Sequence, residues 1–178
     1  RAGSSGDPVP YQERRGMINR LRNTRTIPPW DLQVARGKVQ GVSQINIFGY
    51  SSGVDGTWIP LWESNTALSF PTVAIQMNVS STSVDDNTSS QVTISGLDGN
   101  WNEIIEVVTM NGTANVTTAN SFLRINAMAM TQPASDHTTN QGTIYARNGT
   151  GTAHAAILPG VGRMQNAWYS VPAGKSFY

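Results

Sequence analysis

The chain has 178 residues, the length of one ordinary domain, and a formal net charge of +1. Only 13% of its residues are charged, against about 25% in a typical soluble domain, while Ser, Thr and Asn supply 50 of the 178. This composition excludes a coiled coil or a helical bundle, which need Glu, Lys, Leu and Ala in bulk. The absence of cysteine excludes disulfides, thiol catalysis and cysteine-ligated zinc. No apolar run approaches the roughly 18–20 residues of a membrane span, and no signal-peptide core opens the chain.

Positive charge is concentrated near the N-terminus. Residues 1–38 carry eight basic and three acidic side chains, a net charge of +5, whereas the other 140 residues carry four basic and eight acidic ones, a net charge of −4. Residues 1–36 are predicted to form an extended arm, because Gly and Pro near its start and Pro28-Pro29 near its end disfavour regular structure. A basic arm on a mildly acidic body indicates that the arm contacts a partner.

The arm alternates arginines with apolar residues, and this pattern supplies the candidate binding residues. Arg and Trp are the residue types enriched at interface hot spots. The apolar side chains suit a protein groove, so the pattern favours a protein partner over the phosphates of nucleic acid. A solvated tail without a partner is the alternative. The candidate residues are Arg14, Arg15, Ile18, Arg20, Leu21, Arg22, Arg25 and Trp30.

From residue 37 onward the apolar residues recur with a period of two, which predicts β-strands. Asp98-Gly99 and Asn148-Gly149 predict hairpin turns. Short strands separated by such turns predict an all-β, jelly-roll-like β-sandwich over residues 37–178. Strands are expected from Val42 to Phe48 and over residues 73–79, 91–96, 104–110, 121–130, 142–147, 153–158 and 167–171. The expected core residues are Ile75, Met77, Ile94, Leu123 and one of Ile104 and Ile105.

Titratable residues form no pattern typical of catalysis. Glu103 and Glu106 lie three positions apart on a predicted strand, so they face opposite sides and do not make a carboxylate pair. His137 is expected in a solvated loop, and His154 is expected to pack within a strand. We therefore expect no catalytic residue, no cofactor and no metal site, and an enzyme such as a polysaccharide depolymerase is disfavoured.

Two other groups of residues allow a binding function. The oxygens of Asp85-Asp86-Asn87 are of the type that binds calcium, although their spacing matches no known loop and a polar turn explains them as well. Trp58 and Trp62 flank Pro60, where they cover one end of the sandwich or line a carbohydrate-binding face.

Four segments resemble, in combination, β-rich virion structural proteins of tailed bacteriophages, especially marine and cyanobacterial ones. They are residues 92–104, 109–113, 116–126 and 169–175, and residues 41–50 and 58–62 fit the same pattern. The resemblance covers roughly residues 37–178. It implies a non-enzymatic component of the phage particle, without a cofactor or a membrane, that assembles in the host cytoplasm with copies of itself and with other virion subunits. It also implies further strands beyond residue 175.

We therefore expect a symmetrically recurring virion protein, with a capsid decoration or cement protein as the leading interpretation. A tail, neck or baseplate component is the alternative, and a module that binds host glycans is a second alternative. The number of copies per particle distinguishes the first two, because a decoration protein occurs in hundreds of copies and a neck or tail protein in a dozen or fewer.

Overall fold

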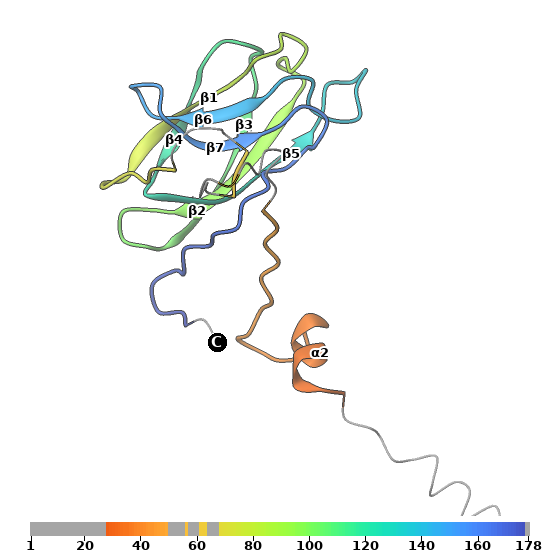
Figure 1. Cartoon of the computed structure of the whole chain (residues 1–178), viewed down its shortest axis with the longest axis vertical. Helices are drawn as coiled ribbons and strands as arrows, with labels where there is room; N and C mark the ends of the chain where they lie inside the picture. The colour runs from red at the N-terminus through yellow and green to blue at the C-terminus, as the bar shows by residue number, and fades with distance from the viewer. Residues whose placement is uncertain (1–27, 50–55, 57–60, 64–67, 177–178) are drawn as a thin grey trace, which may run out of the picture. The chain divides into compact units, whose positions relative to one another are not determined.

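The computed structural model describes residues 28–49, 56, 61–63 and 68–176, which belong to two compact units, Arg1–Asn46 and Ile47–Tyr178 (Figure 1). The first unit contains the short helix α2 (Trp30–Ala35). The extended backbone predicted for residues 1–36 is therefore wrong over Trp30–Ala35, whereas Pro29 before the helix is extended, with φ −48° and ψ 148°. The helix begins there because the N–H of Gln33 donates to the Pro29 carbonyl at 3.1 Å and the Gln33 side chain donates to the Pro28 carbonyl at 2.7 Å.

The strand expected from Val42 to Phe48 is absent, so this prediction is wrong. Residues 42–49 have no regular structure, and Val42, Ile45, Ile47 and Phe48 are 37–65% exposed. The apolar residues there do not alternate strictly, and among the described residues no strand pairs with this segment. A strand without a hydrogen-bonded neighbour has no means of satisfying its backbone groups except solvent.

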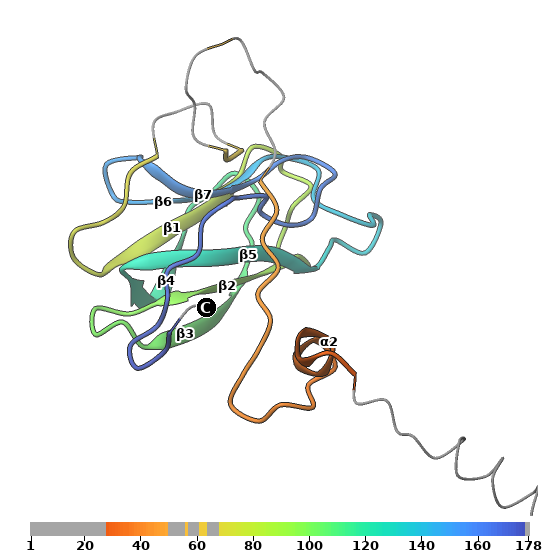
Figure 2. The same ribbon diagram turned by 60° about the horizontal axis from the view of Figure 1, so that its bottom comes forward.

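The second unit is an all-β sandwich, as the sequence predicts (Figure 2). Four strands form one antiparallel sheet in the order β4-β1-β6-β7, and three form the other in the order β3-β2-β5. The first sheet contains β1 (Ile75–Ser81), β4 (Val116–Phe122), β6 (Ile144–Arg147) and β7 (Ala153–Ile157). The second contains β2 (Gln91–Leu97), β3 (Glu103–Thr109) and β5 (Arg124–Gln132). No helix in the described part of the chain is long and apolar enough to cross a membrane.

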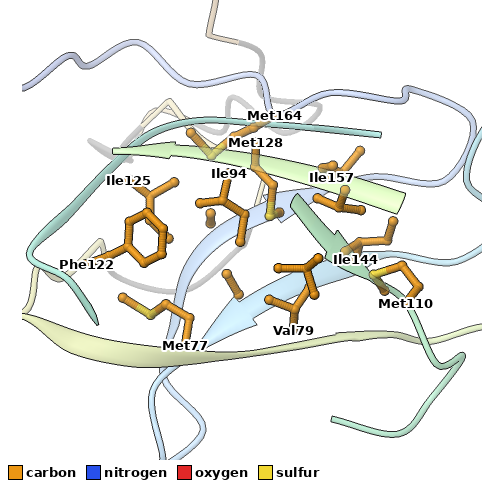
Figure 3. Packing of buried hydrophobic residues seen from close by; sticks show 14 residues of the cluster. Met77, Val79, Ile94, Met110, Phe122, Ile125, Met128, Ile144, Ile157 and Met164 are labelled. Atoms are coloured by element: carbon orange, nitrogen blue, oxygen red, sulfur yellow. The ribbon is translucent and has the colours of Figure 1, made fainter. Parts of the chain in front are cut away.

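The core lies between the sheets and is built from every second residue of the strands (Figure 3). Met77, Ile94 and Leu123 are buried as predicted. Ile75 is only half-buried and packs against the edge of the core. Of the two alternatives on β3, Ile104 contacts the core while Ile105 is 67% exposed. The phase of β3 therefore leaves Ile105 on the solvent side of the strand.

The single strand predicted over residues 121–130 is wrong, because the chain changes sheets in the middle of it. β4 ends at Phe122 in the four-stranded sheet, and β5 starts at Arg124 in the three-stranded sheet. Between them the N–H of Leu123 donates to the Leu97 carbonyl at 2.7 Å. Gly96 lies opposite this corner, at an irregularity in the pairing of β2 with β5. The residues of β4 before 121 were not predicted as a strand.

The strand predicted over residues 167–171 is also wrong. This segment forms no ladder, and the side chain of Asn126 on β5 takes the place of a neighbouring strand. The Asn126 amide donates to the Ser170 carbonyl and accepts from the Ser170 N–H, both at 2.8 Å. One amide side chain thus satisfies both backbone groups of Ser170, so the segment needs no strand partner.

Candidate functional site

The outer face of the three-stranded sheet is partly apolar, and its two central cross-strand rows carry no charge. Glu103, two positions before Ile105, is exposed at one end of the same face. Ile105 and Val107 on β3 are 67% and 55% exposed. Each lies in a cross-strand row whose members share one face of the sheet. We call this surface the β3 face: Ile105, Ser95 and Ala127 form one row, and Val107, Thr93 and Ala129 form the other.

The two edges of this sheet differ. The edge at β5 is covered by the segment around Arg163, which forms an antiparallel bridge with Ala129. The Met130 N–H donates to the Gly162 carbonyl and the Met164 N–H donates to the Met128 carbonyl, both at 2.8 Å. No strand in the described part of the chain pairs with the outer edge of β3. The apolar part of the β3 face is therefore next to an open sheet edge, which is a place where another chain can pair.

The two glutamates of β3 are separated, as predicted. The Glu106 carboxylate accepts the N–H groups of Ala119 and Asn120 at 2.7 and 2.8 Å, so it connects β3 with β4 across the gap between the sheets. Glu103 instead lies beside Tyr169, where burial and then the negative charge of Glu103 raise the pKa of the phenol. The two carboxylates do not converge on a common site.

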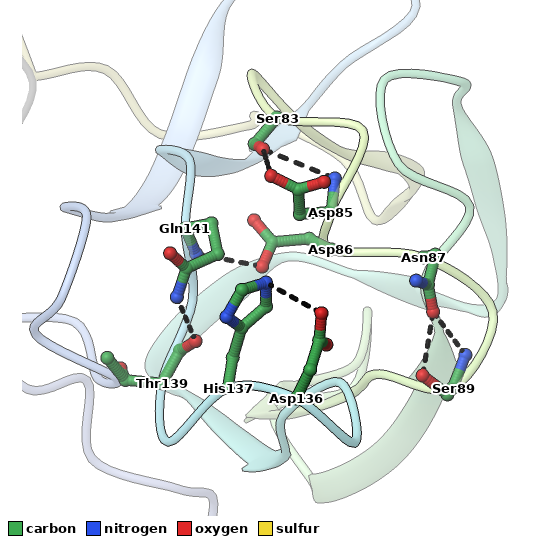
Figure 4. A network of polar contacts seen from close by, with 9 residues as sticks. All are labelled: Ser83, Asp85, Asp86, Asn87, Ser89, Asp136, His137, Thr139 and Gln141. Carbon is green, nitrogen blue, oxygen red and sulfur yellow. Dashed lines mark hydrogen bonds and ion pairs between the residues drawn. The ribbon is translucent and has the colours of Figure 1, made fainter.

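Asp86 is the centre of a buried polar network at the opposite hairpin end of the strands (Figure 4). Its carboxylate accepts the Ser81 hydroxyl at 2.5 Å and the N–H groups of Gln141 and Gly142, each at 2.9 Å. Its backbone carbonyl accepts the Gly112 N–H at 2.8 Å. Asp86 therefore ties together the segments that follow β1, β3 and β5.

The calcium hypothesis for residues 85–87 finds no support in this arrangement. The Asp86 oxygens already accept N–H and O–H donors from three residues. Asp85 accepts the Ser83 hydroxyl, and Asn87 accepts from Ser89, so both side chains serve local turns. In the described ranges, no group of three or more His, Asp or Glu side chains is placed to hold a metal ion.

The two histidines occupy structural positions. His154 is buried on β7, as predicted, and its Nδ1 lies 2.9 Å from the Ser69 carbonyl. His137 lies in the loop after β5 with its Nε2 3.6 Å from an Asp136 carboxylate oxygen (Figure 4). Its side chain is only 25% exposed, so it is less solvated than the sequence suggests.

Of the two interpretations of Trp58 and Trp62, a cover for one end of the sandwich or a carbohydrate-binding face, the second finds no support at Trp62. Trp62 is 4% exposed and makes an edge contact with Trp168, with 6.0 Å between ring centroids. Its ring faces are therefore not offered to solvent. Trp58 lies outside the described residues.

Glu63, next to Trp62, is a carboxyl group in an apolar environment. Both of its oxygens are buried without a well-formed hydrogen bond. Desolvation raises its pKa to about 7, and the nearby backbone N–H groups of Gln165 and Leu158 offset only part of that rise. At neutral pH this group is therefore close to half-protonated.

Protonation of Glu63 is expected to make the stability of the protein depend on pH. Because the folded-state pKa of about 7 lies above the ordinary 4.5, the unfolded chain releases this proton first as pH rises. The contribution of Glu63 protonation to the free energy of unfolding is fully present below pH 4.5, falls as pH rises and is lost above about pH 7. Thermal melting of Glu63→Gln between pH 4.5 and 8 should lack this decline. An identical pH profile in the wild type and the variant would contradict this assignment.

A second candidate site is a pocket that the sequence did not reveal. It has a volume of about 460 Å³ and is lined by Phe70, Val73, Trp101 and Arg124 among others. The Arg124 guanidinium lies between two rings, 4.9 Å from the Phe70 centroid and 5.2 Å from the Trp101 centroid. Phe70 and Trp101 are each 40% exposed. We call this arrangement the Arg124 pocket.

The arm residues predicted to bind a partner are mostly not described by the structure. Arg14, Arg15, Ile18, Arg20, Leu21, Arg22 and Arg25 lie outside the described residues. Trp30 is described: it begins α2 and is 61% exposed. Its role in binding stays a prediction. Comparison of the chain with models of known families, with curated proteins and with solved structures finds no match.

Proposed function

We propose that the chain is a non-enzymatic structural protein of a bacteriophage particle, and that copies of it pack together through the β3 face. The observation that carries the proposal is the pair Ile105 and Val107, two exposed aliphatic side chains on one strand. Contiguous exposed apolar surface on a soluble domain marks a protein interaction site. The resemblance of residues 37–178 to phage virion proteins supplies the biological setting.

A second copy is the occupant that fits this surface best. The β3 face carries no charged residue in its two cross-strand rows, and depletion of charge is characteristic of the centre of an interface. A two-fold contact uses the same patch on both subunits, so the patch must be free of like charges that would repel across the axis. The two rows of the β3 face meet this requirement, and the nearest charge on this side of β3, Glu103, lies outside them. The basic arm, residues 1–36, is proposed to bind a neighbouring virion subunit.

Replacing Ile105 with lysine is expected to reduce self-association at least tenfold without unfolding the protein. Ile105 is 67% exposed, and surface substitutions away from special features change stability by about 0.5 kcal/mol or less. A lysine at the centre of a two-fold contact would instead place two positive charges together and desolvate both. Sedimentation equilibrium measures the association, and a melting curve confirms the fold.

Val84→Lys is the matched control. Val84 is 69% exposed, but it lies in the loop after β1 and not on the β3 face. It should associate like the wild type. Equal association of Ile105→Lys and wild type would show that the β3 face is not the interface.

A capsid decoration or cement protein is the proposed position in the particle, and a tail, neck or baseplate component is the alternative. Quantitative mass spectrometry of purified particles separates them by copy number. Hundreds of copies support the decoration protein, whereas a dozen or fewer support the neck or tail.

A further inference from the structure

We propose that the Arg124 pocket binds an acidic saccharide, with the carboxylate of a uronate unit on the Arg124 guanidinium and the sugar ring against Trp101 and Phe70. The volume of about 460 Å³ lies within the range of small-molecule sites. This proposal does not depend on the β3 face, which carries none of the residues named here.

The hydrogen bonds of Arg124 leave a defined part of its guanidinium unused. One terminal nitrogen, Nη1, donates to the Pro71 carbonyl at 2.9 Å and to the Leu123 carbonyl at 2.7 Å, which accounts for both of its protons. The N–H groups on Nε and on the other terminal nitrogen have no partner among the described residues. That unused edge is the pair of donors that binds a carboxylate through two parallel hydrogen bonds.

The charge of Arg124 also has no counter-ion among the residues that the structure describes. No carboxylate in the described ranges lies within ion-pair distance of it. The nearest turn contributes Asp98, but that carboxylate accepts the N–H groups of Asn100 and Asn102 at 2.8 and 2.9 Å. A half-buried cation over two rings, with no carboxylate beside it in the described part of the chain, fits an anionic ligand.

The backbone at Trp101 shows that this ring is held in place at a cost. Trp101 has φ 64°, the only positive φ of a non-glycine residue in the described part of the chain. This left-handed conformation costs an ordinary residue roughly 1–2 kcal/mol. Strained residues of this kind concentrate at functional sites.

The second hairpin of the protein provides an internal comparison. In the β2–β3 loop, the Asp98 N–H donates to the Asn102 carbonyl and the Trp101 N–H donates to the Asp98 carbonyl. In the β6–β7 loop, the Asn148 N–H donates to the Thr152 carbonyl and the Gly151 N–H donates to the Asn148 carbonyl. The two five-residue loops thus have the same hydrogen bonds. The position that glycine occupies in one, Gly151 with φ 91°, is occupied by Trp101 in the other. Backbone geometry alone would favour glycine at this position, so the ring contacts of Trp101, and not its backbone, account for an indole here.

A saccharide fits the two rings better than a simple anion does. Phe70 and Trp101 are each 40% exposed as whole residues, and Val73 in the same pocket is 65% exposed. An inorganic anion would leave this apolar surface in water, whereas the C–H face of a pyranose covers it. The carboxylate and the ring of a uronate therefore match the two parts of the pocket.

The test compares two sugars that differ only in the carboxylate: methyl galacturonide and methyl galactoside, titrated calorimetrically into the full chain. The galacturonide should bind at least tenfold more tightly. Trp101→Gly should weaken galacturonide binding at least tenfold while the melting temperature stays the same or rises, because the backbone strain is relieved. Arg124→Lys should also weaken it at least tenfold, because lysine keeps the charge but lacks the paired donors.

Arg147→Lys is the matched control, because Arg147 lies 3.7 Å from the Tyr145 ring centroid on β6 and lines no part of the pocket. It should bind like the wild type. Equal binding of the two sugars, or unchanged binding by Trp101→Gly, would overturn the proposal. Acetate binding as tightly as the galacturonide would show an anion site without saccharide recognition, and tighter binding of a glutamate-containing tripeptide would identify a protein ligand instead.

Discussion

Replacing Gly96 with alanine is expected to destabilise the sandwich by about 3 kcal/mol, the upper end of the usual cost of overpacking. A β-carbon at this position would overlap the carbonyl oxygen of Arg124 and lie 2.9 Å from the Phe122 ring. The Arg124 oxygen belongs to the backbone at the corner where the chain changes sheets, so it has no rotamer by which to move away. The corner itself would have to open, and with it the hydrogen bond from Leu123 to Leu97.

A melting curve measures this effect. For a domain of 150–250 residues, about 3 kcal/mol lowers Tm by roughly 6–12 °C. Gly149→Ala is the control, because a β-carbon there meets nothing within 4 Å. It should melt like the wild type. Equal melting temperatures of Gly96→Ala and Gly149→Ala would show that the corner is not tightly packed.

The sheet change at Leu123 illustrates which part of the fold the sequence could not predict. The apolar pattern across β4 and β5 indicates extended backbone, but it contains no information about which sheet each half joins. The first residues of β4 give little signal, because the buried position there is Thr118, whose hydroxyl accepts the Met77 N–H at 2.9 Å. A polar side chain that is buried by hydrogen bonding resembles a loop residue in the sequence.

The strands with strict alternation were predictable because burial of one face fixes their phase. β2 follows its predicted range closely, with Val92 and Ile94 inward. β3 is different, because Ile104-Ile105 and Val107-Val108 are apolar in both phases. The bonds of Glu106 to β4 fit only one phase, and this phase leaves Ile105 and Val107 on the β3 face. The sequence does not show which of these apolar residues of β3 face the core, and this ambiguity indicates that both faces of the strand are apolar.

The Arg124 pocket was not predictable, because its parts come from three distant segments. Phe70 precedes β1, Trp101 lies in the β2–β3 loop, and Arg124 begins β5. The Asp-Gly dipeptide predicts a tight turn with positive φ at these residues, but the positive φ falls on Trp101. A large aromatic residue directly after Asp98-Gly99-Asn100 was the one local signal available.

Replacing Asp86 with alanine is expected to destabilise the protein by roughly 3–5 kcal/mol. Asp86 is 1% exposed, and its removal leaves the Ser81 hydroxyl and the N–H groups of Gln141 and Gly142 without an acceptor. Each buried donor left unsatisfied costs about 1–3 kcal/mol, although the serine hydroxyl is free to turn elsewhere. Because the network joins the segments after β1, β3 and β5, its loss should loosen all three together.

Asp85→Ala is the control for Asp86→Ala. It tests whether the loss of stability comes from the buried carboxylate of Asp86 or from the removal of any acidic side chain in this turn. Asp85 is exposed and accepts only from the neighbouring Ser83, at 3.3 Å, so its removal should change stability by about 0.5 kcal/mol or less. Asp86→Asn should fall between the two alanine variants, because one amide oxygen still accepts while the NH₂ group faces a donor. Hydrogen exchange should show faster exchange at Gln141 and Gly142 in the Asp86 variants alone. If Asp86→Ala and Asp85→Ala have the same melting temperature, the three segments are held by their strands and not by the Asp86 carboxylate.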